Sequence, residues 1–254
     1  MTSFLMRFKK GNMQKSMIEG NTLKLILNFS IPLLLGNLFQ QFYNVVDAAI
    51  VGQTLGSKAL AAVGASSSVQ FLILGFCMGI CQGFAIMVSQ SFGAKRLDEM
   101  HTYIYAGAVW TAITAFVVSI LVVVFCADIL HILQVNDEIF KDAYAYLVVI
   151  FAGIPFTLLY NYLSAILRAI GDSKTPFFFL AFSAVLNIGL DFFCILVLKW
   201  GCAGAAIATI FAQAVSGILC LLLIAFKVNV LHIPKSSRYV DKQHSLKLLA
   251  MGVP

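Results

Sequence analysis

The sequence predicts an all-α polytopic membrane protein, folded as a six-helix transmembrane bundle. Its 254 residues are 61% hydrophobic and 11% charged, with a mean hydropathy of +0.94. Soluble domains are about 45–50% apolar and about 25% charged. Six apolar stretches are each long enough to cross a hydrocarbon core of about 30 Å as a helix. Short polar segments separate them, and these observations together exclude a water-soluble globular protein.

The predicted spans follow one another with short connections. They cover residues 24–51, 63–92, 102–126, 143–167, 177–198 and 203–226. Residues 91–99 carry glycine and charged side chains, and they separate the second span from the third. Pro155 predicts a kink within the fourth span. The turn at residues 171–176 ends on Pro176, which is tolerated at the first position of the fifth helix. The loop at residues 128–142, with four acids and one lysine, is expected outside the cell.

The basic residues predict which side of the membrane each loop occupies. Of the 17 lysines and arginines, 14 lie before or at the first residue of the first span, in the second–third and fourth–fifth loops, or after the sixth span. The other three, Lys58, Lys141 and Lys199, fall on the opposite side. Cytoplasmic loops carry such an excess, so both termini are expected in the cytoplasm of a protein of the cell (plasma or inner) membrane. The net charge of +6 therefore reflects topology rather than a nucleic-acid partner.

The two flanking segments complete the predicted organisation. Residues 1–23 are expected to form a cytoplasmic N-terminal segment without a cleavable signal peptide. Residues 245–254 repeat the pattern of residues 22–32, in which Ser or Thr precedes Leu-Lys-Leu and a proline follows. Transporters are often built from such repeats. We interpret 227–254 as a cytoplasmic inter-lobe linker followed by the truncated start of a seventh helix. Transport would then require a missing C-terminal lobe or a second copy of the chain.

Two acids interrupt the apolar spans. Among the 17 basic and 11 acidic residues, only Asp47 and Asp191 are predicted to lie inside a span rather than at its end. A charged side chain at the centre of a bilayer costs about 2.5–3.5 kcal/mol on insertion scales. Both residues are therefore candidates for a functional site.

A polar stripe surrounds the first of these acids on the first span. Its members recur at the i, i+3, i+4, i+7 and i+10 positions of one helical face, which must face protein or water rather than lipid. The stripe consists of Asn37, Gln40, Gln41, Asn44 and Asp47. It could line a cavity, or it could form hydrogen bonds between helices. Pro32 removes a backbone hydrogen bond upstream, which predicts that the helix bends there.

The fifth and sixth spans carry polar groups at a matching depth. Ser183, Asn187 and Asp191 recur every fourth residue, and Asp191 is expected roughly 10 Å below the outer surface. Thr209 lies at a similar depth on the sixth span. Carboxylate, amide and hydroxyl oxygens are hard ligands that suit Na⁺. Alternatively, one of the carboxyl groups could carry a proton, and the residues alone leave both possibilities open.

The sequence lacks the residues that enzymatic or ATP-driven chemistry within the membrane would require. All four histidines fall outside the spans, and the chain has no GxxxxGK(S/T) motif, so we expect neither an intramembrane hydrolase nor an ATP-driven machine. The six cysteines form no CxxC pair and are interpreted as packing residues. We predict no enzyme, no cofactor, and no metal beyond a possible Na⁺.

Four segments resemble the multidrug and toxic compound extrusion (MATE) transporters, in order along essentially the whole chain. They are Ile31–Gly52, Ala59–Gly64, Leu167–Pro176 and Leu186–Asp191. The Asn187/Asp191 pair is most similar to the prokaryotic DinF-like branch. This resemblance implies a cation-coupling site formed by Asp47, Asn187, Asp191 and Thr209. It also places Asn161 on the substrate cavity beside Gln40, Gln41 and Asn44, and it makes Pro32 the bending point of the first helix.

The resemblance also implies a function. MATE transporters have twelve helices in two lobes and exchange H⁺ or Na⁺ for organic, usually cationic drugs, so this chain resembles the amino-terminal lobe. Secondary antiport of lipophilic cations by alternating access is therefore expected. One alternative is a lipid-linked oligosaccharide flippase of the same superfamily, and another is an inactive truncated membrane fragment.

Overall fold

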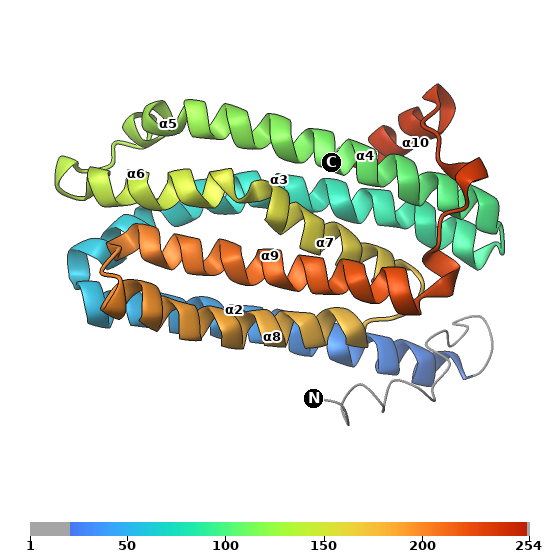
Figure 1. The fold of residues 1–254 in the computed structure, drawn as a ribbon, viewed down its shortest axis with the longest axis horizontal. Coiled ribbons are helices and arrows are strands. Elements are labelled where there is room, and N and C mark those ends of the chain that lie inside the picture. The colour runs from blue at the N-terminus through green and yellow to red at the C-terminus, as the bar shows by residue number, and fades with distance from the viewer. Residues whose placement is uncertain (1–20, 253–254) are drawn as a thin grey trace.

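The computed structural model describes residues 21–252, which form an elongated bundle of helices with no strand in that range (Figure 1). The long helices run nearly parallel to one another along the length of the molecule. In chain order the elements are α2 (Thr22–Leu55), α3 (Ser57–Gly93), α4 (Leu97–Val124), α5 (Cys126–Ile132), α6 (Asp137–Ala152), α7 (Ile154–Ala169), α8 (Lys174–Phe192), the π-helical turn η1 (Phe193–Val197), α9 (Gly201–Lys227), the 3₁₀ turns η2 (Asn229–Leu231) and η3 (Lys235–Ser237), and α10 (Lys242–Gly252).

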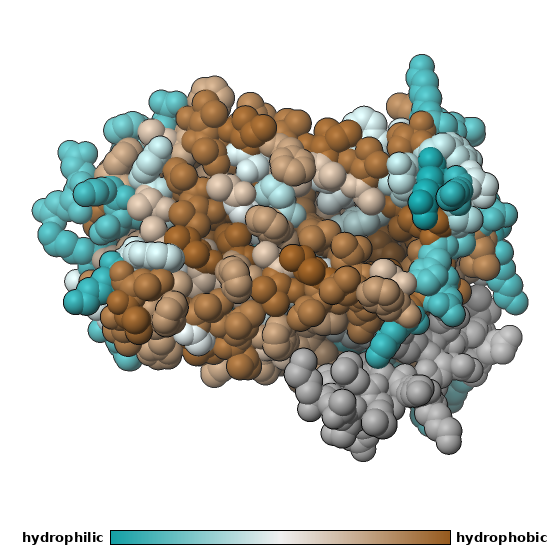
Figure 2. Space-filling model, viewed as in Figure 1, coloured by the Kyte–Doolittle hydropathy of each residue, from teal (hydrophilic) through white to brown (hydrophobic). Residues whose placement is uncertain are grey.

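The bundle has the dimensions and surface of a membrane protein. Five segments, namely α2, α3, α4, α8 with η1, and α9, are each long and apolar enough to cross a bilayer, and the bent pair α6–α7 makes a sixth. Figure 2 shows a broad apolar band across the middle of the visible face, with hydrophilic residues gathered at its two ends. The all-α, six-span architecture predicted from the sequence is confirmed.

The bend between α6 and α7 results from two neighbouring residues. The axes of the two helices differ by 48°. Gly153 occupies the break, where a Cβ atom would overlap the side chain of Ile210 on α9. Pro155 lies in the first turn of α7 and cannot donate a backbone hydrogen bond. The fourth span therefore bends at Gly153, which allows Ile210 to approach closely, and at the nearby Pro155.

Some helix ends differ from the sequence expectation. The acidic segment at 128–142 is largely helical rather than a loop, because α5 begins before it and α6 starts inside it at Asp137. The side chain of Asn136 accepts a hydrogen bond from the backbone of Glu138, and acids in the first turn suit the positive end of a helix. α8 begins at Lys174, before Pro176, because the Asp172 carboxylate caps it. α2 continues through Pro32 as one helix, so a bend at that proline stays a prediction.

The packing leaves α2 at the edge of the bundle. α9 packs against α6, α7 and α8, whereas α2 packs against α8 and α3 and makes only a few contacts with α9. Most of the α2 surface is exposed, including the side chains of Leu34, Leu38 and Phe42.

Candidate functional site

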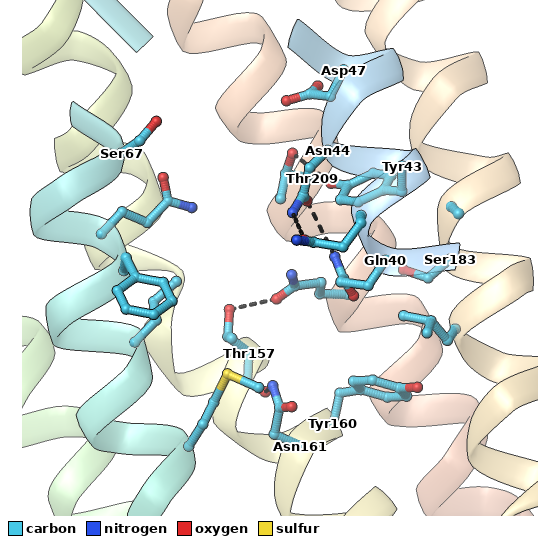
Figure 3. A pocket seen from close by; sticks show the side chains of 18 of the residues that line it. Gln40, Tyr43, Asn44, Asp47, Ser67, Thr157, Tyr160, Asn161, Ser183 and Thr209 are labelled. Carbon is cyan, nitrogen blue, oxygen red and sulfur yellow. Dashed lines mark hydrogen bonds between the residues drawn. The ribbon is translucent and has the colours of Figure 1, made fainter. Parts of the chain in front are cut away.

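A cavity of about 530 Å³ opens between α2, α3, α7, α8 and α9 (Figure 3). Tyr146 of α6 also reaches it. Many of the side chains that line the cavity are polar. They are Gln40, Gln41, Tyr43, Asn44, Asp47, Ser67, Gln70, Tyr146, Thr157, Tyr160, Asn161, Ser183, Thr209 and Gln213. The four residues predicted to form a substrate cavity, Gln40, Gln41, Asn44 and Asn161, are all among them.

Two carboxyl groups meet at one end of this cavity. Asp47 of α2 lines its wall, and Asp191 of α8 lies behind the wall with none of its surface exposed. The two side chains are adjacent and interact electrostatically. Asn187, one helical turn before Asp191, is only 1% exposed. The fold therefore brings together acids that are more than a hundred residues apart in the sequence.

Thr209 of α9 forms hydrogen bonds to both helices that carry the two carboxyl groups. Its hydroxyl accepts a hydrogen bond of 3.2 Å from the Asn187 side-chain amide. The same hydroxyl lies 3.2 Å from the hydroxyl of Tyr43 on α2, which forms a second hydrogen bond. Thr209 thus links α8 to α2, and all four residues proposed for cation coupling lie in one continuous cluster.

The cluster contains buried oxygen atoms that lack hydrogen-bond donors among the described residues. They are Oδ1 of Asp47, Oδ1 of Asn187 and both carboxyl oxygens of Asp191. Buried polar atoms are normally satisfied, and a charged group left unpaired in a region of low dielectric constant is especially costly. Such oxygens can bind a monovalent cation directly, or the carboxyl groups can take up protons. Within residues 21–252, no group of three or more His, Cys, Asp or Glu side chains could hold a metal ion.

The other end of the cavity is lined by amides and hydroxyls. On α2, Asn44 accepts a hydrogen bond from Gln40 and donates one to Gln41, which ties the three amides into one row. Across the cavity, Thr157 of α7 donates a hydrogen bond of 2.5 Å to Gln213 of α9. These groups offer a ligand both donors and acceptors without any formal charge.

Several residues at the site were missed by the sequence reasoning. Gln213 follows Thr209 by one helical turn, and Tyr43 precedes Asp47 by one turn, so the same period-four spacing could have identified both. Gln70 of α3 lies two residues after a run of three serines at 66–68 and directly before a long apolar stretch, so it was also detectable. The position of Tyr146, close to both carboxyl groups, was not detectable, because it depends on how α6 packs against α2 and α8.

Comparison with known proteins gives one family and a consistent group of relatives. The family model described as MatE matches residues 32–193. The chain is 34% identical to a "Probable multidrug resistance protein YpnP" of Bacillus subtilis, over 93% of this chain and 53% of that protein. It is 31% identical to YoeA of the same organism, also named a probable multidrug resistance protein, over 89% of this chain and 50% of the relative. The chain spans about half the length of the curated relatives it matches.

The fold is similar to that of solved transporters. One is described as an outward-facing multidrug resistance MATE family transporter of the MOP superfamily. It superposes with a TM-score of 0.85 at 24% identity and covers 92% of this chain and 52% of that structure. At this level of identity the likeness concerns the fold alone.

Proposed function

Because the chain belongs to the MATE family, whose members are membrane transporters and not enzymes, we propose that it forms the cation-coupling lobe of a secondary multidrug antiporter. The transporter exchanges H⁺ or Na⁺ for organic, mainly lipophilic and cationic compounds. The observation that carries this proposal is the cluster of four unpartnered oxygens on Asp47, Asn187 and Asp191. Two adjacent carboxylates repel each other when both are charged, and a bound cation or proton relieves that repulsion.

The cavity lining supports a cationic substrate. Asp47 supplies negative charge, the amides supply hydrogen bonds, and none of the described lining residues is a lysine, arginine or histidine. The volume of about 530 Å³ falls within the range of roughly 300–1,000 Å³ that is usual for sites binding drug-sized molecules. A lipid-linked oligosaccharide flippase would need basic side chains for a pyrophosphate group, so the lining favours the antiporter.

The mechanism follows from the position of the carboxylate pair beside the substrate cavity. A proton or Na⁺ that enters from outside occupies the Asp47/Asp191 site and reduces its negative charge by one unit. This change in charge alters the contacts of α2 with α8, and α2 bends about Pro32 and releases the substrate outward. A membrane potential of 100 mV supplies about 2.3 kcal/mol for each charge that crosses.

A second lobe completes the cavity on the outer side of α2. Gln41 and Asn44 are exposed on a helix whose remaining surface is largely apolar. Amide groups facing lipid would lose their hydrogen bonds to water, so this side of α2 is expected to face protein or a water-filled space. We propose that a C-terminal lobe covers it, with a second copy of the chain as the alternative.

The membrane orientation follows from the charges at the ends of the bundle. The α3–α4 turn, with Lys95 and Arg96, lies at the same end as α10 (Figure 1). We propose that this end is cytoplasmic and that the protein resides in the cell membrane.

The proposal is tested by measuring ion-dependent stability and drug efflux. Na⁺ should raise the free energy of unfolding of the purified chain by about 2.7 kcal/mol at one hundred times its dissociation constant. If protons are the coupling ion, a dependence of stability on pH replaces the effect of Na⁺. Asp47→Asn and Asp191→Asn should abolish the response, whereas Asp128→Asn, at an exposed acid outside the spans, should keep it.

The same three variants, placed in the full-length transporter, separate the candidate functions. Efflux of a fluorescent lipophilic cation should be lost in the Asp47 and Asp191 variants and kept in the Asp128 variant. Efflux at the unmodified level in both intramembrane variants would refute the site assignment. An unmodified protein that neither binds ions nor exports any substrate would identify an inactive fragment.

A further inference from the structure

Gln213 of α9 has one end of its side-chain amide held in place. The Thr157 hydroxyl of α7 donates a hydrogen bond of 2.5 Å to the Gln213 Oε1 atom. The other acceptor near that hydroxyl, the Gly153 carbonyl, is 3.4 Å away, and a hydroxyl has a single proton to donate. A rotated Gln213 amide would leave the Thr157 proton with only this longer bond, so the geometry favours the orientation in which Oε1 accepts.

The nitrogen of the same amide is free. Gln213 lines the cavity and is partly buried, and within residues 21–252 its Nε2 group donates to no other group. Both N–H bonds are therefore available to a bound molecule. Because the amide oxygen is already engaged, Gln213 presents donors to the cavity rather than an acceptor.

The α7 residues beside Gln213 use their donors within the protein. The Tyr160 hydroxyl donates a hydrogen bond of 2.9 Å to the Pro176 carbonyl. The Asn161 amide donates one of 2.8 Å to the Thr157 carbonyl. In the described part of the chain, α7 and α9 bring two amides to the cavity, and only that of Gln213 keeps both N–H bonds unused.

The α3 side of the cavity supplies hydrocarbon rather than further donors. Beyond Gln70, the α3 side chains that line the cavity are those of Phe71, Leu74 and Met78. Such a surface excludes water, so a polar atom of a ligand that loses its protein partner here has no water to replace it. A hydrogen bond from Gln213 should therefore affect which ligands bind.

The free amide lies well away from the carboxylate pair. Gln213 follows Thr209 by one turn towards the C-terminal end of α9, and Thr209 lies level with the turn that precedes Asp191. The separation along the bundle is about two turns, or roughly 11 Å. Figure 3 shows the same order, with Asp47 at one end of the view and Thr157 well below it. A ligand that reaches both groups must be extended, with its charge and its hydrogen-bonding group apart.

We propose that Gln213 selects, among organic cations, those that carry a neutral hydrogen-bond acceptor such as a carbonyl or ether oxygen. The inference rests on the proposed function, because it takes Asp47 as the residue that attracts the cationic group. Gln213 donates to the acceptor of the ligand. Thr157 is a positioning residue, which keeps the amide turned so that its N–H bonds face the ligand.

The test compares two compounds that differ in one group. One is a long-chain trimethylammonium ion with a ketone part-way along its chain, and the other is its methylene analogue. Their binding to the purified chain in lipid nanodiscs is measured by equilibrium dialysis, with the binding to empty nanodiscs subtracted. The quantity compared between variants is the ratio of the two dissociation constants. Binding of the methylene compound also shows that each variant is folded.

The variants separate the acceptor subsite from the charge. Gln213→Met keeps the length of the side chain and removes its donors, so the ratio should shift by about two- to tenfold towards the methylene compound. Thr157→Val frees the amide to rotate and should shift the ratio in the same direction by less, whereas Thr157→Ser should not. Asp47→Asn should weaken the binding of both compounds equally. Gln82→Leu, an exposed glutamine of α3 outside the cavity, is the control and should match the native chain.

An unchanged ratio in Gln213→Met would overturn the proposal, and Asp47-dependent binding of both compounds would then leave the cationic substrate in place. An unchanged ratio in Thr157→Val would overturn the positioning role of Thr157. A chain that binds neither compound would contradict both this inference and the proposed cationic substrate. Binding requires no ion gradient, so a failure of ion-coupled efflux would leave a shifted ratio standing.

Discussion

Gly153→Ala is the most direct test of how the bend in the fourth span shapes the site. The added methyl would overlap three carbon atoms of the Ile210 side chain, two of which are bonded to its Cβ and cannot move far. Overpacking of this kind costs about 1–3 kcal/mol in a well-packed core. Ile210 directly follows Thr209, so the displacement should reach the hydroxyl that bonds Asn187 and Tyr43.

The assay is reversible unfolding of the purified chain in mixed micelles, followed by circular dichroism. Ile210→Ala removes the overlapping atoms, so the double variant should recover part of the loss, with a coupling energy of about 0.5–3 kcal/mol between the two sites. Gly64→Ala is the control, because a methyl there meets no atom within 4 Å. In a helix interior that control should be neutral or stabilising by up to about 1 kcal/mol. If the two substitutions are simply additive, the steric explanation of the bend is wrong.

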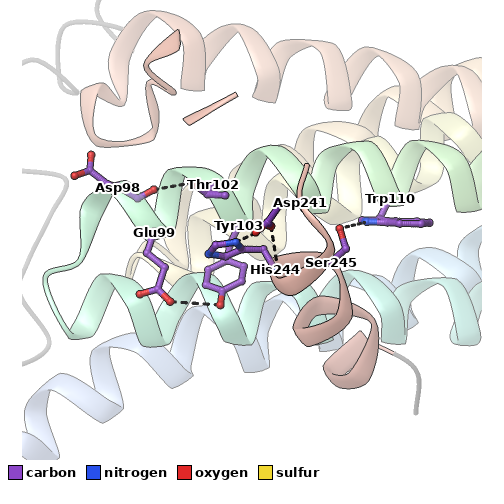
Figure 4. Close-up of polar contacts among 8 residues, drawn as sticks. All are labelled: Asp98, Glu99, Thr102, Tyr103, Trp110, Asp241, His244 and Ser245. Carbon is purple, nitrogen blue, oxygen red and sulfur yellow. Dashed lines mark hydrogen bonds and ion pairs between the residues drawn. The ribbon is translucent and has the colours of Figure 1, made fainter. Parts of the chain in front are cut away.

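Three further predictions concern single interactions. Thr209→Val keeps the side-chain shape but removes two hydrogen bonds, so the ion-dependent rise in unfolding temperature should shrink. Thr209→Ser keeps the hydroxyl and should retain that rise. If the two variants respond equally, the Thr209 hydroxyl does not contribute to the ion site. Desolvation raises the pKa of Asp241, but hydrogen bonds from the His244 backbone and ring outweigh it and hold that pKa below its ordinary 3.8 (Figure 4). The carboxylate cap of α10 is therefore complete above about pH 3.8 and is lost only as the pH falls through the lowered pKa, so hydrogen exchange in α10 should accelerate only in that acid range. Lys58→Ala breaks an exposed 2.8 Å ion pair with Glu138 and should cost at most about 1 kcal/mol of unfolding free energy; a larger loss would show that the pair is not screened by solvent.

The predictable part of the fold rests on features that act locally along the chain. Apolar stretches of sufficient length predict the spans, and Pro155 predicts the bend in the fourth span. The start of α6 at Asp137 was not predicted, because four acids in a short segment suggested a loop, although two of them, Asp137 and Glu138, suit the first turn of a helix. Gly153 gave no signal of its own, since its role depends on where Ile210 of a distant helix lies.

The candidate site was predictable in its chemistry rather than in its geometry. A lone carboxyl group in an apolar span is costly to bury, so the sequence alone indicates Asp47 and Asp191 as candidate site residues. Their contact depends on the rotation of α2 relative to α8, which the sequence pattern does not determine. The links through Tyr43 and Thr209 depend on the same rotation.

The exposure of the amide row on α2 has an evolutionary consequence. Gln41 and Asn44 contribute to the cavity wall but bury little of their own surface in the bundle. Substitutions at exposed positions usually change the stability of a protein by no more than about 0.5 kcal/mol. Variants that recognise new compounds can therefore arise at these two positions without unfolding the lobe, whereas the fully enclosed Asp191 has no such freedom. Under the proposed function, selection can thus diversify what the protein recognises while the residues proposed to bind the driving ion stay unchanged.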